Sequence, residues 1–130
     1  MNKIDRKISV WASFFMALGI GLGAFGAHGL KQLVDTEALN TFEIGVRYQL
    51  MHGLALLVIG LSGRVPAKVA RLVLVCFLLG ILLFSGSLYL LAVDDALSID
   101  LGFLGPITPL GGMAFIVGWL ILGYKLWKNR

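Results

Sequence analysis

The chain has 130 residues, of which 58% are hydrophobic and only 14% are charged, and its mean hydropathy is +0.91. These values lie outside the range of soluble globular domains, so the composition indicates a membrane protein and excludes a large soluble domain. The formal net charge of +4 would favour an acidic partner or nucleic acid in a soluble protein, so its placement along the chain decides what it means.

Four apolar segments are long enough to cross a bilayer, whose hydrocarbon core of about 30 Å needs roughly 20 residues of helix. In chain order they cover about residues 8–28, 36–62, 70–93 and 109–127. The second is the least uniform, because it carries Glu43, Arg47 and His52. The first exceeds the apolar run of about 7 to 15 residues in a cleaved signal peptide, so we expect it to be retained. Residues 1–130 are therefore predicted to form one domain, an all-α bundle of four transmembrane helices.

Capping residues predict where two of the helices begin. Asp35 or Thr36 is suited to the N-cap of the second helix. In the stretch GPITPLGG, residues 105–112, Thr108 is suited to an N-cap and Pro109 to the first helical position. The fourth helix is therefore expected to begin just after Thr108.

The basic residues follow the membrane spans. Nine of the eleven lie on one side of the four-span arrangement, whereas the acidic residues lie mostly on the other side. By the positive-inside rule, both termini and the loop between the second and third spans are predicted to be cytoplasmic. The basic residues on that side are Lys3, Arg6, Lys7, Arg64, Lys68, Arg71, Lys125, Lys128 and Arg130. Trp11, Trp119, Tyr124 and Trp127 lie toward the same side, roughly where an aromatic belt is expected.

The stretch GIGLGAFGAHG, residues 19–29, contains the G-x-G-x-x-G spacing of dinucleotide-binding proteins. That motif works after a strand and at a helix N-terminus, whereas here it lies near the C-terminal end of an apolar helix, so nucleotide binding is not expected. On a helix, small residues instead form a stripe that lets a neighbouring backbone come close. The glycines predicted to pack helices together are Gly19, Gly23, Gly26, Gly80, Gly111 and Gly118.

Polar side chains in or near the spans are candidates for function, because ionisable groups are costly in a membrane. Glu43 and Arg47 are four residues apart and are expected to lie near the outer interface, as a structural ion pair or as part of a functional site. His52 lies deeper, and it is either a neutral side chain hydrogen-bonded between helices or a proton relay or ligand site. The candidate polar cluster consists of His28, Glu43, Arg47, Gln49, His52, Ser85 and Thr108.

The sequence contains no pattern typical of catalysis. No nucleophile stands beside a base, and no H-x-x-x-H or C-x-x-C spacing is present, so we expect no enzyme activity, no metal and no cofactor. Neither nucleic acid nor a nucleotide is expected as a partner. Cys76 is the single cysteine, and we expect it to pack inside the third span.

Four motifs together resemble a known family. GAFGAHGLK (23–31), FEIGVRYQLMHGLAL (42–56), FSGSLYLL (84–91) and GPITPLGG (105–112) are similar to domain-of-unknown-function family 423, small bacterial membrane proteins with a mitochondrial relative in animals. The resemblance implies a four-helix protein of the bacterial cytoplasmic membrane and implies no activity. It also draws attention to His28, Glu43, Arg47, Tyr48, Gln49, His52, Ser85, Ser87, Tyr89, Pro106, Thr108 and Pro109.

Three functions are compatible with these observations. The favoured one is a structural or accessory bundle that binds lipid or a larger membrane complex through its polar cluster. The alternative is an oligomeric transporter or channel for ions or small solutes, with Glu43, Arg47 and His52 between protomers. A membrane-embedded enzyme ranks last, because two catalytic groups would have to meet at the headgroup level.

Overall fold

The computed structural model describes residues 1–128, which form helices and the loops between them without any strand. Its longer helices are α1 (Lys3–His28), α2 (Thr36–Ser62), α3 (Ala67–Gly80), α4 (Gly86–Leu91) and α6 (Ile107–Lys128). A π-helical segment, Ile81–Ser85, joins α3 to α4, and the loops contain the short α5 (Asp94–Leu97) and 3-10 turns at Leu30–Gln32 and Gly102–Leu104. Four helical stretches, Lys3–Gln32, Thr36–Ser62, Ala67–Leu91 and Gly102–Lys128, are long and apolar enough to cross a membrane. The prediction of an all-helical chain with four apolar spans is confirmed.

Side-chain caps explain where the first two long helices begin. α1 starts ahead of the apolar run because the Asn2 side chain accepts the backbone N–H groups of Ile4 and Asp5, both at 2.9 Å. The Asp5 carboxylate in turn accepts the backbone N–H of Asn2, which completes a capping box. Asp35 caps α2, since its Oδ1 accepts the backbone N–H of Ala38 at 2.8 Å.

The start of α6 differs from the sequence prediction. The helix begins at Ile107, so Thr108 lies inside its first turn and is not the N-cap. The physical reason is a competing contact, because the Thr108 hydroxyl lies 2.6 Å from Ser87 Oγ on the neighbouring span. The third span also differs from a regular helix over 70–93, since the π-helical segment interrupts it and α4 ends at Leu91.

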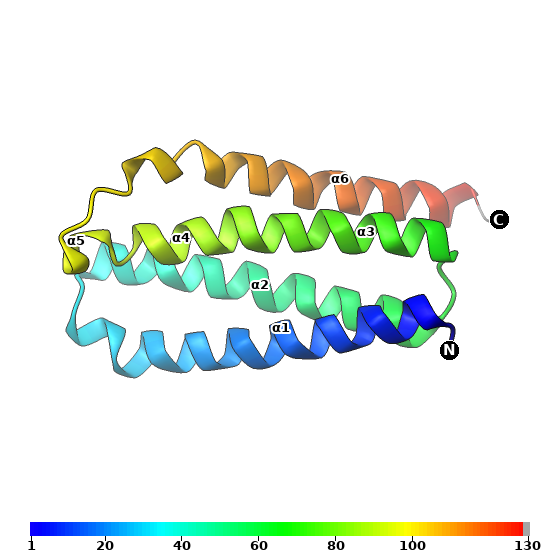
Figure 1. Ribbon diagram of the computed structural model, residues 1–130, viewed down its shortest axis with the longest axis horizontal. Coiled ribbons are helices and arrows are strands. Elements are labelled where there is room, and N and C mark those ends of the chain that lie inside the picture. Colours follow the sequence, from blue (N-terminus) through cyan, green and yellow to red (C-terminus); the bar gives the residue numbers. More distant parts are fainter. Residues whose placement is uncertain (129–130) are drawn as a thin grey trace.

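The four spans lie side by side in the order α1, α2, α3–α4 and α6 (Figure 1). The most extensive packing joins α1 to α2 and α3 to α6, while α2 also packs along the π-helical segment and α4. Figure 1 shows the N-terminus and the C-terminal end of α6 together at one end, and α5 at the other. The molecule is therefore built from two antiparallel hairpins, with α2 and α3–α4 in the middle.

Glycines on α1 bring it close to α2. A Cβ atom added at Gly19 would lie 2.8 Å from Leu50 Cδ2, closer than real Cβ atoms approach. At Gly23 and Gly26 the added atom would lie 3.3 Å and 3.2 Å from side-chain carbons of α2. Because lipid offers no hydrophobic drive for helices to associate, this close van der Waals contact is the main source of their attraction.

Glycines on α3 and α6 serve the second hairpin. The ring of Phe115 lies directly over Gly80, and the ring of Phe77 would lie 2.6 Å from a Cβ atom at Gly118. Gly111 makes the closest approach, because an added Cβ would overlap the backbone of Leu83 and Phe84 in the π-helical segment. The π-helical segment and Gly111 therefore belong to one backbone-to-backbone contact.

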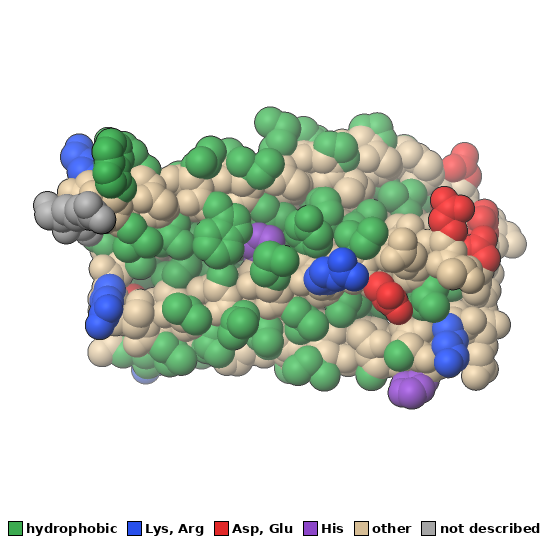
Figure 2. Space-filling view, turned by 180° about the vertical axis from the view of Figure 1, so that it is seen from behind, with side chains coloured by type: hydrophobic (Ala, Val, Ile, Leu, Met, Phe, Trp, Pro, Cys, Tyr) green, Lys and Arg blue, Asp and Glu red, His purple; other side chains and the backbone are tan. Residues whose placement is uncertain are grey.

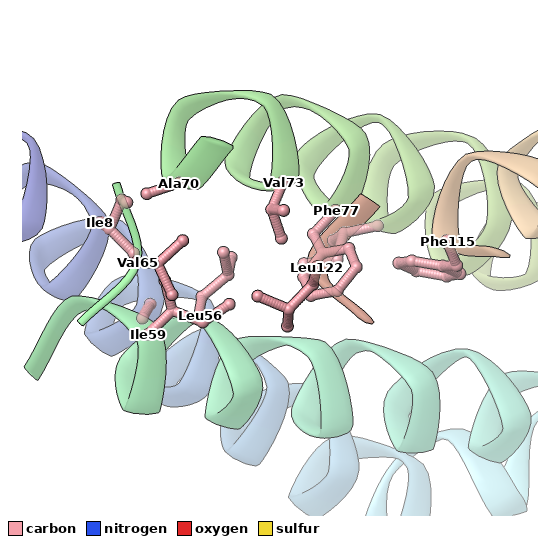
Figure 3. Close-up of a cluster of buried hydrophobic side chains, with 11 residues drawn as sticks. Ile8, Leu56, Ile59, Val65, Ala70, Val73, Phe77, Phe115 and Leu122 are labelled. Carbon is pink, nitrogen blue, oxygen red and sulfur yellow. The ribbon is translucent and has the colours of Figure 1, made fainter. Parts of the chain in front are cut away.

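A cluster of buried apolar side chains fills the space between the two hairpins toward the end that holds the termini. In Figure 3, Val73 and Phe77 point from α3 toward Leu56 and Ile59 of α2. Phe115 and Leu122 of α6 and Ile8 of α1 belong to the same cluster. This core fixes the depth and rotation of α2, which carries most of the candidate polar residues.

Candidate functional site

Gln49 connects three helices through its amide group. It is only 1% exposed, and its Nε2 donates to the backbone carbonyl of Phe15 on α1 at 2.9 Å. Its Oε1 accepts the hydroxyl of Tyr89 on α4 at 2.8 Å. Two glycines make room for these bonds: a side chain at Gly19 would crowd Gln49 Nε2, and one at Gly45 would collide with the Tyr89 ring. Both ends of the amide are therefore hydrogen-bonded, as a buried polar group requires.

His52 connects α2 to α6. Its Nδ1 lies 2.7 Å from the carbonyl oxygen of Tyr48, and its Nε2 lies 3.0 Å from Trp119 Nε1. A carbonyl only accepts and an indole N–H only donates, so Nδ1 carries the proton and Nε2 is the acceptor. The imidazole is thus held neutral as a single tautomer, with both nitrogens occupied.

Aromatic rings surround the His52 side chain, which is 2% exposed. Phe115 stacks on the imidazole with ring centroids 3.6 Å apart, and Phe77 meets it edge-on at 4.8 Å. Tyr48 stacks at 6.2 Å on the same helix. Because both ring nitrogens are hydrogen-bonded and aromatic rings enclose the imidazole, the geometry favours a structural histidine over a proton relay.

Ser87 and Thr108 connect α4 to the start of α6. Their hydroxyl oxygens are 2.6 Å apart, and Ser87 Oγ also lies 2.6 Å from the carbonyl oxygen of Leu83 and 3.0 Å from that of Phe84. A serine has only one hydroxyl proton, so when it is donated to a carbonyl, Thr108 must be the donor to Ser87. Ser87 therefore satisfies carbonyls of the π-helical segment and ties that segment to α6.

Ser85 is the exception among the buried polar side chains of residues 1–128. It is 0% exposed, and its Oγ has no hydrogen-bond partner. The side chain faces Tyr89, but no bond of acceptable geometry joins the two hydroxyls. A buried hydroxyl without a partner costs about 1–3 kcal/mol, so Ser85 is a locally destabilising group beside the Gln49–Tyr89 pair.

The structure does not bring the three remaining candidates into this interior. His28, Glu43 and Arg47 are all exposed. Within the described residues, no ion pair joins Glu43 to Arg47 or either of them to His28. Figure 2 shows a basic and an acidic side chain next to each other on an otherwise mostly apolar flank, away from the charged ends. The predicted cluster therefore has two parts. Gln49, His52, Ser85 and Thr108 lie between the helices, whereas His28, Glu43 and Arg47 are exposed.

The sequence does not identify Trp119 as the hydrogen-bond partner of His52. Its position in the chain predicts an aromatic belt at the membrane surface, whereas in the structure its indole N–H donates to His52. The sequence points to Ser87 and Tyr89 only through the family resemblance. No spacing links Trp119 to His52, so only a three-dimensional arrangement identifies this contact. The described part of the chain contains no group of three or more His, Cys, Asp and Glu side chains close enough to hold a metal ion.

Four apolar spans joined by hydrogen bonds between helices define a multi-pass, all-helical membrane protein. More particularly, the chain belongs to the family described as "Protein of unknown function (DUF423)", which matches residues 22–112.

Its relatives include proteins named UPF0382 membrane protein. One from Haemophilus influenzae is 42% identical over 111 residues, covering 85% of this chain and 86% of the relative. One from Staphylococcus haemolyticus is 43% identical and covers 85% and 87%, and YwdK of Bacillus subtilis is 40% identical and covers 81% and 83%. No solved structure matches the chain. The names of these relatives place them in membranes and assign them no activity.

Proposed function

We propose that the protein is a non-catalytic accessory bundle of the bacterial cytoplasmic membrane. In this proposal it binds a larger membrane complex through the face of α2 that carries Glu43 and Arg47, which we call the charged face. Its partner subunit presents an acidic and a basic group of its own to that face. The single observation that carries the proposal is that both side chains are exposed within an apolar span and neither forms an ion pair within residues 1–128.

Charged side chains at the depth of the charged face are costly in lipid, and a partner would lower that cost. At 1.5 Å per residue, Glu43 lies about 10 Å and Arg47 about 16 Å from the start of α2, a helix about 40 Å long. With the core centred on this helix, Arg47 lies well inside a hydrocarbon core of about 30 Å, deeper than the outer interface expected from the sequence. An arginine at the centre of a membrane helix costs about 2.5 to 3.5 kcal/mol, and ionisable residues at that depth normally face protein. A partner subunit with complementary charges would remove most of this cost.

The buried polar residues support a role without chemistry. Gln49 and His52 have both ends of their side chains hydrogen-bonded, and Ser87 and Thr108 bond each other. General acid–base catalysis needs a group within reach of a substrate proton, and these groups are enclosed by helices. What they provide is cohesion between the spans.

Charge distribution supports the proposed orientation, with both termini in the cytoplasm. Figure 2 shows acidic side chains gathered at the end opposite the chain termini, while basic side chains occur at the end that holds them. The positive-inside rule assigns the basic end to the cytoplasm.

Native mass spectrometry of the full chain, extracted from its own membrane in mild detergent, tests the proposal. We expect a stoichiometric partner subunit that is lost in Glu43→Gln and in Arg47→Gln. Glu37→Gln is the matched control, because Glu37 is also exposed on α2 but lies in its first turn. Retention of the partner by both variants, or a wild-type protein with no partner, would overturn the proposal.

The same charged face is the observation on which the transporter alternative depends, since two or more copies would place Glu43 and Arg47 between protomers. The two functions differ in their outcome in liposomes. The accessory proposal expects no ion or solute flux through purified protein and a heteromeric complex in membranes. A homo-oligomer with flux that Glu43→Gln abolishes would replace it with the transporter.

A further inference from the structure

A groove runs between α1 and the α3–α4 span on the side of α2 roughly opposite Arg47. Its volume is about 380 Å³, and Gln49 forms part of its floor. Phe15, Leu18 and Leu22 line it from α1, and Leu78, Ile81 and Leu82 line it from the other span. Arg47 and Gln49 are two residues apart, or about 200° around the helix, so this groove is separate from the charged face.

The groove has the dimensions and surface of an acyl-chain site. Its lining is almost entirely apolar, and the exposed side chains of Leu18 and Leu82 at its edges open it to the surroundings. From Trp11 to Leu22 it extends along eleven residues of α1, about 16 Å. One leaflet of a bilayer is about half of a 30 Å core, so a single lipid tail spans this length.

A basic depression continues the groove toward the end of the molecule that holds the termini. It has a volume of about 210 Å³ and is lined by Arg6, Lys7 and Trp11, of which Trp11 also lines the groove. Lys7, Trp11, Phe15, Leu18 and Leu22 follow one another at spacings of four, four, three and four residues. Such spacings keep side chains on one face of a helix, so charge, indole and apolar surface form one continuous stripe.

The chemistry of the depression selects an anionic group. Arg6 and Lys7 are exposed, and within residues 1–128 neither forms an ion pair. Asp5, the nearest acid in sequence, is only 3% exposed and is engaged in the capping box of α1. The Trp11 indole stacks on Phe15 with ring centroids 5.9 Å apart, and Trp side chains of this kind prefer the boundary between headgroups and tails.

We propose that this groove and depression together bind one anionic phospholipid, with an acyl chain along α1 and the phosphate against Arg6 and Lys7. Gly86 contributes by leaving space, since a Cβ atom there would meet only the carbonyl oxygen of Ile81, at 3.8 Å. The site does not depend on the charged face or on its partner.

Native mass spectrometry of the full chain released from bilayers of phosphatidylcholine and phosphatidylglycerol tests this proposal. We expect the wild type to retain one phosphatidylglycerol in preference to phosphatidylcholine. Each basic residue near an anionic lipid is worth roughly a fivefold change in affinity, so Arg6→Gln combined with Lys7→Gln should lower retention about 25-fold. Lys68→Gln combined with Arg71→Gln removes the same charge outside the groove and should change it little. Equal losses in the two double variants, or equal retention of both lipids, would overturn the proposal.

Quenching of tryptophan fluorescence by phosphatidylglycerol with brominated tails provides the second measurement, and it leaves both basic residues of the site in place. The expected result is quenching of the Trp11 emission, identified by its loss in Trp11→Phe, that exceeds quenching by brominated phosphatidylcholine. An excess of inorganic phosphate should not reverse it, because the acyl chain contributes to binding. Reversal by phosphate, or equal quenching by the two lipids, would overturn the proposal.

Discussion

The indole N–H of Trp119 donates to Nε2 of His52 at 3.0 Å, across 67 positions of the sequence. Because the opposite nitrogen of the ring faces the Tyr48 carbonyl, this contact fixes the tautomer of the imidazole and couples α2 to α6.

Loss of the bond between His52 and Trp119 should destabilise the bundle. Trp119→Phe removes the donor and leaves Nε2 of His52 buried without a partner. Interhelical hydrogen bonds in membrane proteins contribute about 0.6 to 1.7 kcal/mol, and we expect a coupling energy in that range. A double-mutant cycle with His52→Phe, measured by unfolding in mixed detergent, gives the value. Trp127→Phe is the control, because Trp127 is 72% exposed, and additive effects at positions 52 and 119 would contradict the prediction.

The Gln49–Tyr89 pair should behave asymmetrically. Tyr89→Phe removes one hydroxyl and should cost about 1 kcal/mol of the free energy of unfolding. Gln49→Leu should cost more, because it removes the bond to Phe15 as well and leaves the Tyr89 hydroxyl without an acceptor. Thermal unfolding of the two variants checks the order. Tyr124→Phe, at an exposed tyrosine, serves as the reference. A larger loss of stability in Tyr89→Phe than in Gln49→Leu would be inconsistent with the geometry.

Alanine at Gly111 should be far more disruptive than alanine at Gly123. A Cβ atom at position 111 would overlap the backbone of the neighbouring span, whereas nothing lies within 4 Å of one at position 123. Overpacking typically costs about 1–3 kcal/mol, and a clash with backbone relaxes less readily than one with a side chain. Gly123→Ala should instead stabilise α6 by about 0.5–1 kcal/mol, because alanine is the better helix former. Similar stabilities for the two variants would contradict the close packing of α6 against the π-helical segment.

Cysteine labelling should place both chain ends on the cytoplasmic side. In a Cys76→Ser background, a cysteine at Asp95 should react with a membrane-impermeant maleimide added outside intact spheroplasts. A cysteine at Lys3 should react only after the membrane is permeabilised. The reverse pattern would contradict the proposed orientation. A third variant, Lys128→Cys, should behave like Lys3→Cys, and a different response of the two would contradict the even number of spans.

Apolar runs and capping residues were enough to predict the four spans and the start of α2, because both signals are local. The glycines of α1 were recognisable for the same reason, since a regular helix places Gly19, Gly23 and Gly26 on nearly one face. The predicted start of α6 was wrong, because the Thr108 hydroxyl has a partner on another span. The π-helical segment was also missed, and it lies against Gly111 of another span, a contact that no local pattern indicates.

The candidate site was harder to predict than the fold. The sequence grouped seven polar residues into one candidate cluster, but the rotation of α2 separates Gln49 and His52, which face inward, from Glu43 and Arg47, which face outward. Gln49 is two residues from Arg47 and His52 is nine from Glu43, spacings of about 200° and 180° around a helix, and only packing decides which side is buried. The partners of His52 and Gln49 lie 67 and 40 positions away, beyond the reach of any spacing argument.

Two hydrogen bonds between the spans, one to His52 and one to Ser87, involve side chains of α6. While the chain is being synthesised, the first three spans enter the membrane before α6 is available, so an imidazole and a hydroxyl are at that stage missing partners. Insertion of the last helix then completes both contacts at once. A nascent protein that stops short of this step leaves Nε2 of His52 without its donor inside the membrane, so the first three spans are held together less firmly than the finished bundle.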